Sequence, residues 1–102
     1  MGLCIALQTE SGKQIELIAD EKNLLDKVLG YPDGRVFPML ASIDRYGDTT
    51  FNRMQIDRFL TEWETLFSKV TDPAEQSLLQ AVKGLAEKSK QDVHQYLVFI
   101  GD

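Results

Sequence analysis

Apolar side chains recur every three or four residues between Met54 and Val70, and this spacing constrains the fold more than any other feature of the chain. It gives a helix one apolar face, which other elements of the fold must cover. The face is formed by Ile56, Phe59, Leu60, Trp63, Leu66, Phe67 and Val70. We therefore predict a long helix over 53–70 whose aromatic side chains belong to the core.

A second long helix is predicted over 73–91. Asp72 can cap its first turn, Pro73 suits the first helical position, and Glu75 can reach back to a free amide. Its apolar face consists of Leu78, Leu79, Val82, Leu85 and Ala86. Because the connection between the two helices is short, we expect them to pack antiparallel.

Three segments have the composition of strands, namely 2–8, 14–19 and 94–100. The polar stretch between the first two contains Gly12, which favours an antiparallel hairpin. A short helix over 20–29 follows the hairpin. We therefore predict an α+β fold, with a small three-stranded, mainly antiparallel sheet covered by the short helix and the two long ones.

The 102 residues are enough for one domain, which we place over 1–102. The single cysteine cannot close an intrachain disulfide, and no cysteine and histidine cluster has zinc spacing. No signal sequence or apolar run of bilayer length is present, so we expect a cytoplasmic protein with no membrane contact. A net charge of −5 disfavours binding to nucleic acid.

The segment 44–53 concentrates polar side chains in a region without helical or strand periodicity. Arginine and tyrosine are enriched at protein interfaces, so one hypothesis is a recognition loop. Its candidate binding residues are Arg45, Tyr46, Asp48, Thr49, Asn52 and Arg53. The alternative is a purely structural segment, in which Asp48, Thr49 or Asn52 caps the following helix while Tyr46 and Phe51 fill the core.

Catalytic signatures are weak. The weak candidates are His94, Asp48 and Asp44, because a lone histidine oriented by a carboxylate could act as a general acid or base. This arrangement would suit a small hydrolase or a ligand-binding protein. The aspartates lack calcium-loop spacing and no phosphate-binding glycine motif is present, so we predict neither a metal nor a cofactor.

Carboxylates on the two long helices suggest an acidic outer surface, formed by Asp57, Glu62, Glu64, Asp72 and Glu75. Such a surface attracts basic or mixed-charge proteins. Our first functional hypothesis is a non-enzymatic protein-binding module, of toxin-neutralising or adaptor type, that uses this surface and the segment 44–53. A homodimer is also compatible with the sequence if the apolar strand 94–100 lies at the sheet edge.

Two motifs stand out in the chain, namely Tyr46-Gly47-Asp48-Thr49-Thr50-Phe51-Asn52, with Gln55 beyond it, and the ending Tyr96-Leu97-Val98-Phe99-Ile100-Gly101-Asp102. Both resemble motifs of an uncharacterised family of short bacterial proteins. The opening Met1-Gly2-Leu3 is similar as well. The resemblance implies a complete single-domain protein of bacterial, cytoplasmic type, and it implies no activity.

Overall fold

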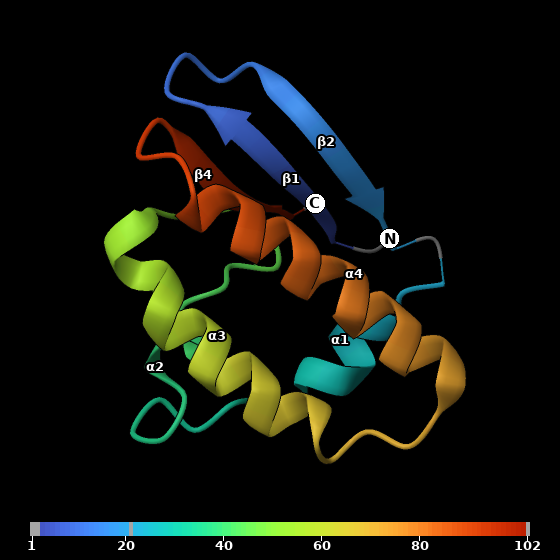
Figure 1. Cartoon of the computed structure of the whole chain (residues 1–102). Coiled ribbons are helices and arrows are strands. Elements are labelled where there is room, and N and C mark those ends of the chain that lie inside the picture. The colour runs from blue at the N-terminus through green and yellow to red at the C-terminus, as the bar shows by residue number, and fades with distance from the viewer. Residues whose placement is uncertain (1–2, 21, 102) are drawn as a thin grey trace.

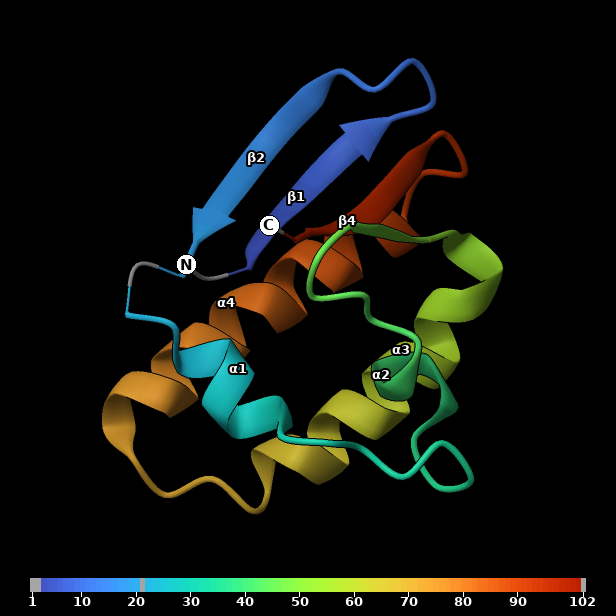
Figure 2. The ribbon, with the colours of Figure 1, turned by 180° about the vertical axis from the view of Figure 1, so that it is seen from behind.

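The computed structural model describes residues 3–20 and 22–101. Met1, Gly2, Glu21 and Asp102, which fall within several of the predicted segments and motifs, lie outside the described residues. Along the chain the elements are β1 (Cys4–Thr9), β2 (Gln14–Ala19), α1 (Leu24–Leu29), α2 (Pro38–Ala41), β3 (Asp48–Phe51), α3 (Arg53–Phe67), α4 (Pro73–Lys90) and β4 (Gln95–Ile100). The helices gather on one side of the sheet (Figure 1 and Figure 2).

The α+β class with an antiparallel sheet and several helices is confirmed, but the prediction of three strands is wrong. The sheet has four strands in the order β2-β1-β4-β3, and every neighbouring pair is antiparallel. The missed strand, β3, has only four residues, which is too short to show a period in the sequence. Since β4 lies between β1 and β3, it is not an edge strand, and the argument that a second copy would cover it no longer applies.

The predicted helices are present with shorter bounds. The Oδ1 and Oδ2 atoms of Asp20, the first residue of the predicted short helix, accept from the amides of Leu24 and Leu25 at 2.9 and 2.7 Å. That helix nevertheless begins at Leu24, because the backbone at Asn23 is left-handed, with a φ of 57°. α3 ends at Phe67, before the predicted position 70.

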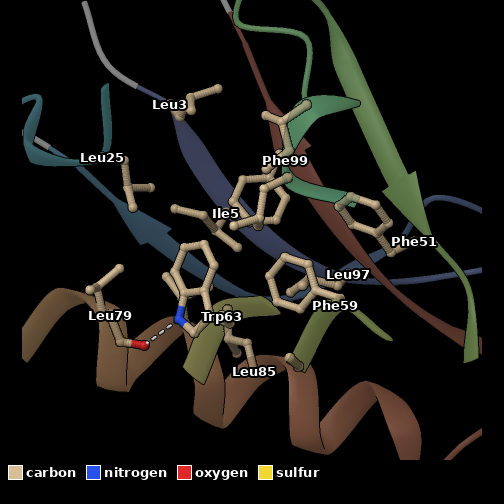
Figure 3. Packing of buried hydrophobic residues seen from close by; sticks show 14 of the residues in the cluster. Leu3, Ile5, Leu25, Phe51, Phe59, Trp63, Leu79, Leu85, Leu97 and Phe99 are labelled. Carbon is tan, nitrogen blue, oxygen red and sulfur yellow. Dashed lines mark hydrogen bonds between the residues drawn. The ribbon is translucent and has the colours of Figure 1, made fainter. Parts of the chain in front are cut away.

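Four aromatic side chains form the centre of the core between the sheet and the two long helices (Figure 3). Phe51 of β3, Phe99 of β4, and Phe59 and Trp63 of α3 are buried, with ring centroids 5.1 to 6.2 Å apart. The Trp63 indole Nε1 donates to the carbonyl of Leu79 in α4 at 2.9 Å. The aromatic face of α3 is therefore core, as its spacing predicts.

The other face of the sheet carries a second row of apolar side chains. By register, Leu17, Ala6, Val98 and Thr50 lie side by side across the four strands. Ala6 and Val98 are buried, whereas Leu17 on the edge strand is half exposed. The helices lie on the opposite side (Figure 2).

Glu62 of α3 is not part of an acidic outer surface, which corrects the prediction for this residue. It is 3% exposed, and its carboxylate accepts from the amides of Met39 and Leu40 at 3.1 Å and from Arg58 Nε at 2.9 Å. A helix start leaves its first amides without partners inside the helix, and here Glu62 supplies the acceptor. The carboxylate therefore ties α2 to α3.

We expect Glu62→Ala to lower the free energy of unfolding by about 2 kcal/mol, because one buried and one partly buried amide lose their acceptor. Urea unfolding of the variant and the parent measures the difference. The control is Glu64→Ala, which removes an exposed carboxylate from the same helix and should change stability by less than about 0.5 kcal/mol. Equal losses in both variants would contradict the structural role of Glu62.

Candidate functional site

The polar segment 44–53 begins with a tight turn before β3. Asp44 Oδ1 accepts from the amide of Tyr46 at 2.8 Å, and the amide of Asp44 donates to Thr49 Oγ1 at 2.8 Å. These two bonds hold the turn in one conformation. Asp44 and Thr49 therefore stabilise the local structure.

The carboxyl end of the described chain packs against this turn. The amide of Gly101 donates to the carbonyl of Gly47 at 2.7 Å. A Cβ atom at Gly101 would lie 2.6 Å from the backbone carbon and oxygen of Arg45, so only glycine fits there without displacement. The segments 46–52 and 96–101 are thus in direct contact.

We expect Gly101→Ala to destabilise the protein by about 1 kcal/mol, since the methyl group displaces the turn and strains its hydrogen bond to Gly47. Gly84→Ala is the control. Gly84 lies inside α4 with open space around its Cα, so alanine should stabilise the helix by about 1 kcal/mol. Thermal or urea unfolding measures both, and the same sign for the two variants would refute the close packing at Gly101.

Arg45 fixes the turn against the end of α1. Its Nη1 lies 3.0 Å from Asp26 Oδ1, its Nη2 donates to the carbonyl of Gly30, and its guanidinium lies 5.4 Å from the centroid of the Tyr31 ring. A planar guanidinium suits such a combination of forked donation and stacking. Arg45, predicted as a binding residue, therefore also holds two segments of the fold together.

A groove of about 360 Å³ lies between these two segments. Its lining consists of Leu29, Gly30, Tyr31, Pro32, Leu40, Ala41, Ile43, Asp44, Arg45 and Tyr46. Leu29, Leu40 and Ile43 are buried core residues, whereas Tyr31 is 96% exposed and Tyr46 is 84% exposed. The groove thus combines buried apolar residues with two solvent-exposed aromatic rings.

The other predicted binding residues divide between structural and exposed positions. Asn52 caps α3, because its side chain accepts hydrogen bonds from the backbone amides of Met54 and Gln55. In turn, the side-chain oxygen of Gln55 accepts from the backbone amide of Asn52. Asp48 and Arg53 are exposed. Of the two aromatic residues that the structural alternative placed in the core, Phe51 is buried and Tyr46 is not. Some residues of 44–53 therefore stabilise the fold, whereas others are exposed.

Tyr31 is the residue of the groove that the sequence did not indicate. It opens the turn Tyr31-Pro32-Asp33-Gly34, and the sequence gives no sign that this turn lies beside 44–46. The proximity depends on Arg45, which reaches across 15 positions of the chain to Gly30. An exposed aromatic residue next to a proline turn is the one signal that could have drawn attention to it.

The structure does not bring His94 together with Asp44 or Asp48. Asp48 pairs with Ile100 at one end of β4, and His94 precedes the other end, about 20 Å away along an extended strand. Neither His94 nor Asp48 lines the groove. The predicted histidine and aspartate pair is therefore not formed.

The carboxylate beside His94 is that of Glu10, whose Oε1 lies 2.7 Å from His94 Nδ1. The two residues meet because β1 and β4 pair antiparallel, with Thr9 opposite Gln95. The hydrogen bond to Glu10 and the charge of its carboxylate raise the pKa of His94 above its ordinary 6.5. Both side chains are exposed.

We expect Glu10→Gln to lower the pKa of His94 toward 6.5, since the stabilising charge is lost. An NMR titration of the only imidazole in the chain measures this directly. Because folding raises this pKa, the pair stabilises the fold fully below the unfolded-state value, and this contribution disappears as the pH rises through the folded-state value. An unchanged pKa in the variant would contradict the pairing.

The predicted acidic surface on the long helices is largely paired with cations. Asp57 Oδ1 lies 2.6 Å from Lys90 Nζ, and Glu64 Oε1 lies 3.0 Å from Lys83 Nζ. Glu75 is buried, so its prediction as a surface residue is wrong, and its Oε2 lies 3.1 Å from Lys27 Nζ. Asp72 caps α4 by accepting from the Glu75 amide at 3.0 Å. These contacts reduce the negative potential that the helices present to a partner.

Across 3–20 and 22–101, no three side chains of histidine, cysteine, aspartate or glutamate gather closely enough to hold a metal ion. No helix in the same ranges has both the length and the apolar character needed to cross a membrane.

Comparison of the chain with protein-family models, curated proteins and solved structures finds no significant match.

Proposed function

We propose that this chain is a non-enzymatic protein-binding module, of toxin-neutralising or adaptor type, whose partner docks on the groove between Tyr31 and Tyr46. The observation that carries the proposal is the pair of tyrosines, 96% and 84% exposed, beside buried apolar residues. Tyrosine offers a large contact area with few rotatable bonds and a polar tip for hydrogen bonding. Such residues dominate the binding energy of many protein interfaces.

The rigidity of the groove supports this function. One wall is held by the bonds of Asp44 to Tyr46 and Thr49, and it is joined to the other wall by Arg45. A surface that is already ordered loses less conformational entropy when a partner binds. The side chains that fix the turn therefore contribute to binding by holding it in place.

Charge supports a basic or mixed-charge partner. The chain carries a net charge of −5, and Asp44 and Asp48 of the segment 44–53 are exposed. Long-range attraction between opposite charges raises association rates and weakens as salt is added. The helix carboxylates contribute less than the sequence suggests, because lysines pair with several of them.

The test is capture of a partner from a lysate of the source cell by the tagged chain, at low and high salt, with mass spectrometry. We expect a stoichiometric partner that the double variant Tyr31→Ala/Tyr46→Ala captures at least about tenfold more weakly, because two interface anchors are lost. Both rings are exposed, so the melting temperature should stay within about 2 °C of the parent.

The matched control is Met54→Ala/Val93→Ala, which removes two exposed apolar side chains that do not line the groove. It should capture the partner as well as the parent does. Equal capture by the tyrosine variant and the control would refute the groove as the docking site. Absence of any partner at both salt concentrations would refute a protein-binding function.

A further inference from the structure

Two charged residues of opposite sign line the groove, and they differ in how fully they are paired. Asp44 and Arg45 are the charged residues among those that line it, and the guanidinium of Arg45 is already paired with Asp26 at 3.0 Å. Asp44 uses Oδ1 to accept from the Tyr46 amide, while its Oδ2 accepts no hydrogen bond from any described residue. Asp44 is also exposed. The groove therefore offers an exposed carboxylate, one oxygen of which accepts no hydrogen bond from a described residue, and its one lining cation, Arg45, is already paired.

The aromatic rings beside this carboxylate suit a cation. The faces of aromatic rings attract positive charge, and arginine is the commonest partner. Arg45 already lies over the Tyr31 ring at 5.4 Å, which shows that this ring accepts a guanidinium. Because Tyr31 is almost fully exposed, most of its surface is open to a second group. Tyr46 stands on the same turn as the Asp44 carboxylate.

We propose that the groove receives an arginine side chain of the partner protein, whose guanidinium pairs with Asp44 Oδ2 and lies against the rings of Tyr31 and Tyr46. This inference rests on the proposed protein-binding function and specifies the chemistry of the partner. Arginine fits better than lysine, because its planar guanidinium both stacks on aromatic rings and donates in a fork to a carboxylate. A positively charged partner also complements the net charge of −5.

The probe is a hexapeptide of alternating glycine and arginine, titrated into the labelled protein while the amide signals of Gly30, Tyr31 and Tyr46 are followed by NMR. Two matched peptides carry lysine or citrulline in place of arginine, and citrulline keeps the shape without the charge. We expect the arginine peptide to shift these signals, the lysine peptide to bind about threefold more weakly, and the citrulline peptide at least about tenfold more weakly. Equal binding of the arginine and citrulline peptides would overturn the inference.

Two isosteric variants separate a specific site from general attraction. Asp44→Asn keeps an oxygen that can accept from the Tyr46 amide, so the turn is retained while the charge is lost. Glu87→Gln removes the same charge from an exposed position on α4. We expect Asp44→Asn to weaken the arginine peptide about fivefold and Glu87→Gln by less than about 1.5-fold. Equal weakening would show attraction to the whole surface and would overturn the arginine site.

The same variants distinguish the failure of this inference from the failure of the proposed function. Capture of the cellular partner should be weakened by Asp44→Asn and retained by Glu87→Gln. If Asp44→Asn captures the partner normally while the double tyrosine variant loses it, the arginine site is refuted and the binding function stands. If the double tyrosine variant also captures the partner normally, both the arginine site and the groove as the docking site are refuted.

Discussion

The packing of Phe51 against Phe59 and Phe99 is the contact on which the position of the candidate site depends. Phe51 ends β3, and its burial fixes the register of that short strand against β4. A buried phenylalanine contributes about 2 to 3 kcal/mol, which is large compared with the other contacts of a four-residue edge strand. With Phe51 in the core, the turn 44–47 must lie at the opposite end of β3, where it meets α1 and the carboxyl end of the chain.

Several contacts then fix the turn that forms one wall of the groove. Asn52 starts α3 immediately after Phe51, so the chain is held at one end of the strand. At the other end, the carbonyl of Gly47 accepts a hydrogen bond from the amide of Gly101, and Arg45 forms an ion pair with Asp26 of α1. The result is a turn whose backbone is fixed while the ring of Tyr46 remains in solvent. This division between held backbone and exposed ring is what a preorganised binding surface requires.

The sequence predicts the elements that depend on local patterns. The long helices follow from apolar spacing, Asp72 and Asn52 act as caps, and the hairpin between β1 and β2 forms where the polar stretch with Gly12 lies. β3 was missed because four residues carry no measurable period. Its Thr-Thr-Phe sequence favours a strand, but only pairing with β4 determines that one forms.

The rest depends on contacts between distant parts of the chain. Glu62 has the polar character of an exposed helix residue, yet it is buried because the start of α2, 23 positions earlier, supplies amide donors. Glu10 and His94 are 84 positions apart and meet only through the register of β1 and β4. Tyr31 becomes part of a groove only through Arg45. Composition and periodicity carry no information on such pairs, so Arg45 and Tyr46 can be selected from the sequence as candidates, whereas Tyr31 on the other side of the groove cannot.

Photo-crosslinking in the source cell tests the central claim most directly. A benzoylphenylalanine placed at position 46 stands beside the groove, and one placed at the exposed position 93 lies near the far end of β4. We predict that illumination joins the chain to one protein from position 46 and that the crosslinked peptide of that protein contains an arginine near the attachment point. The same protein crosslinked from position 93 and not from position 46 would contradict docking at the groove.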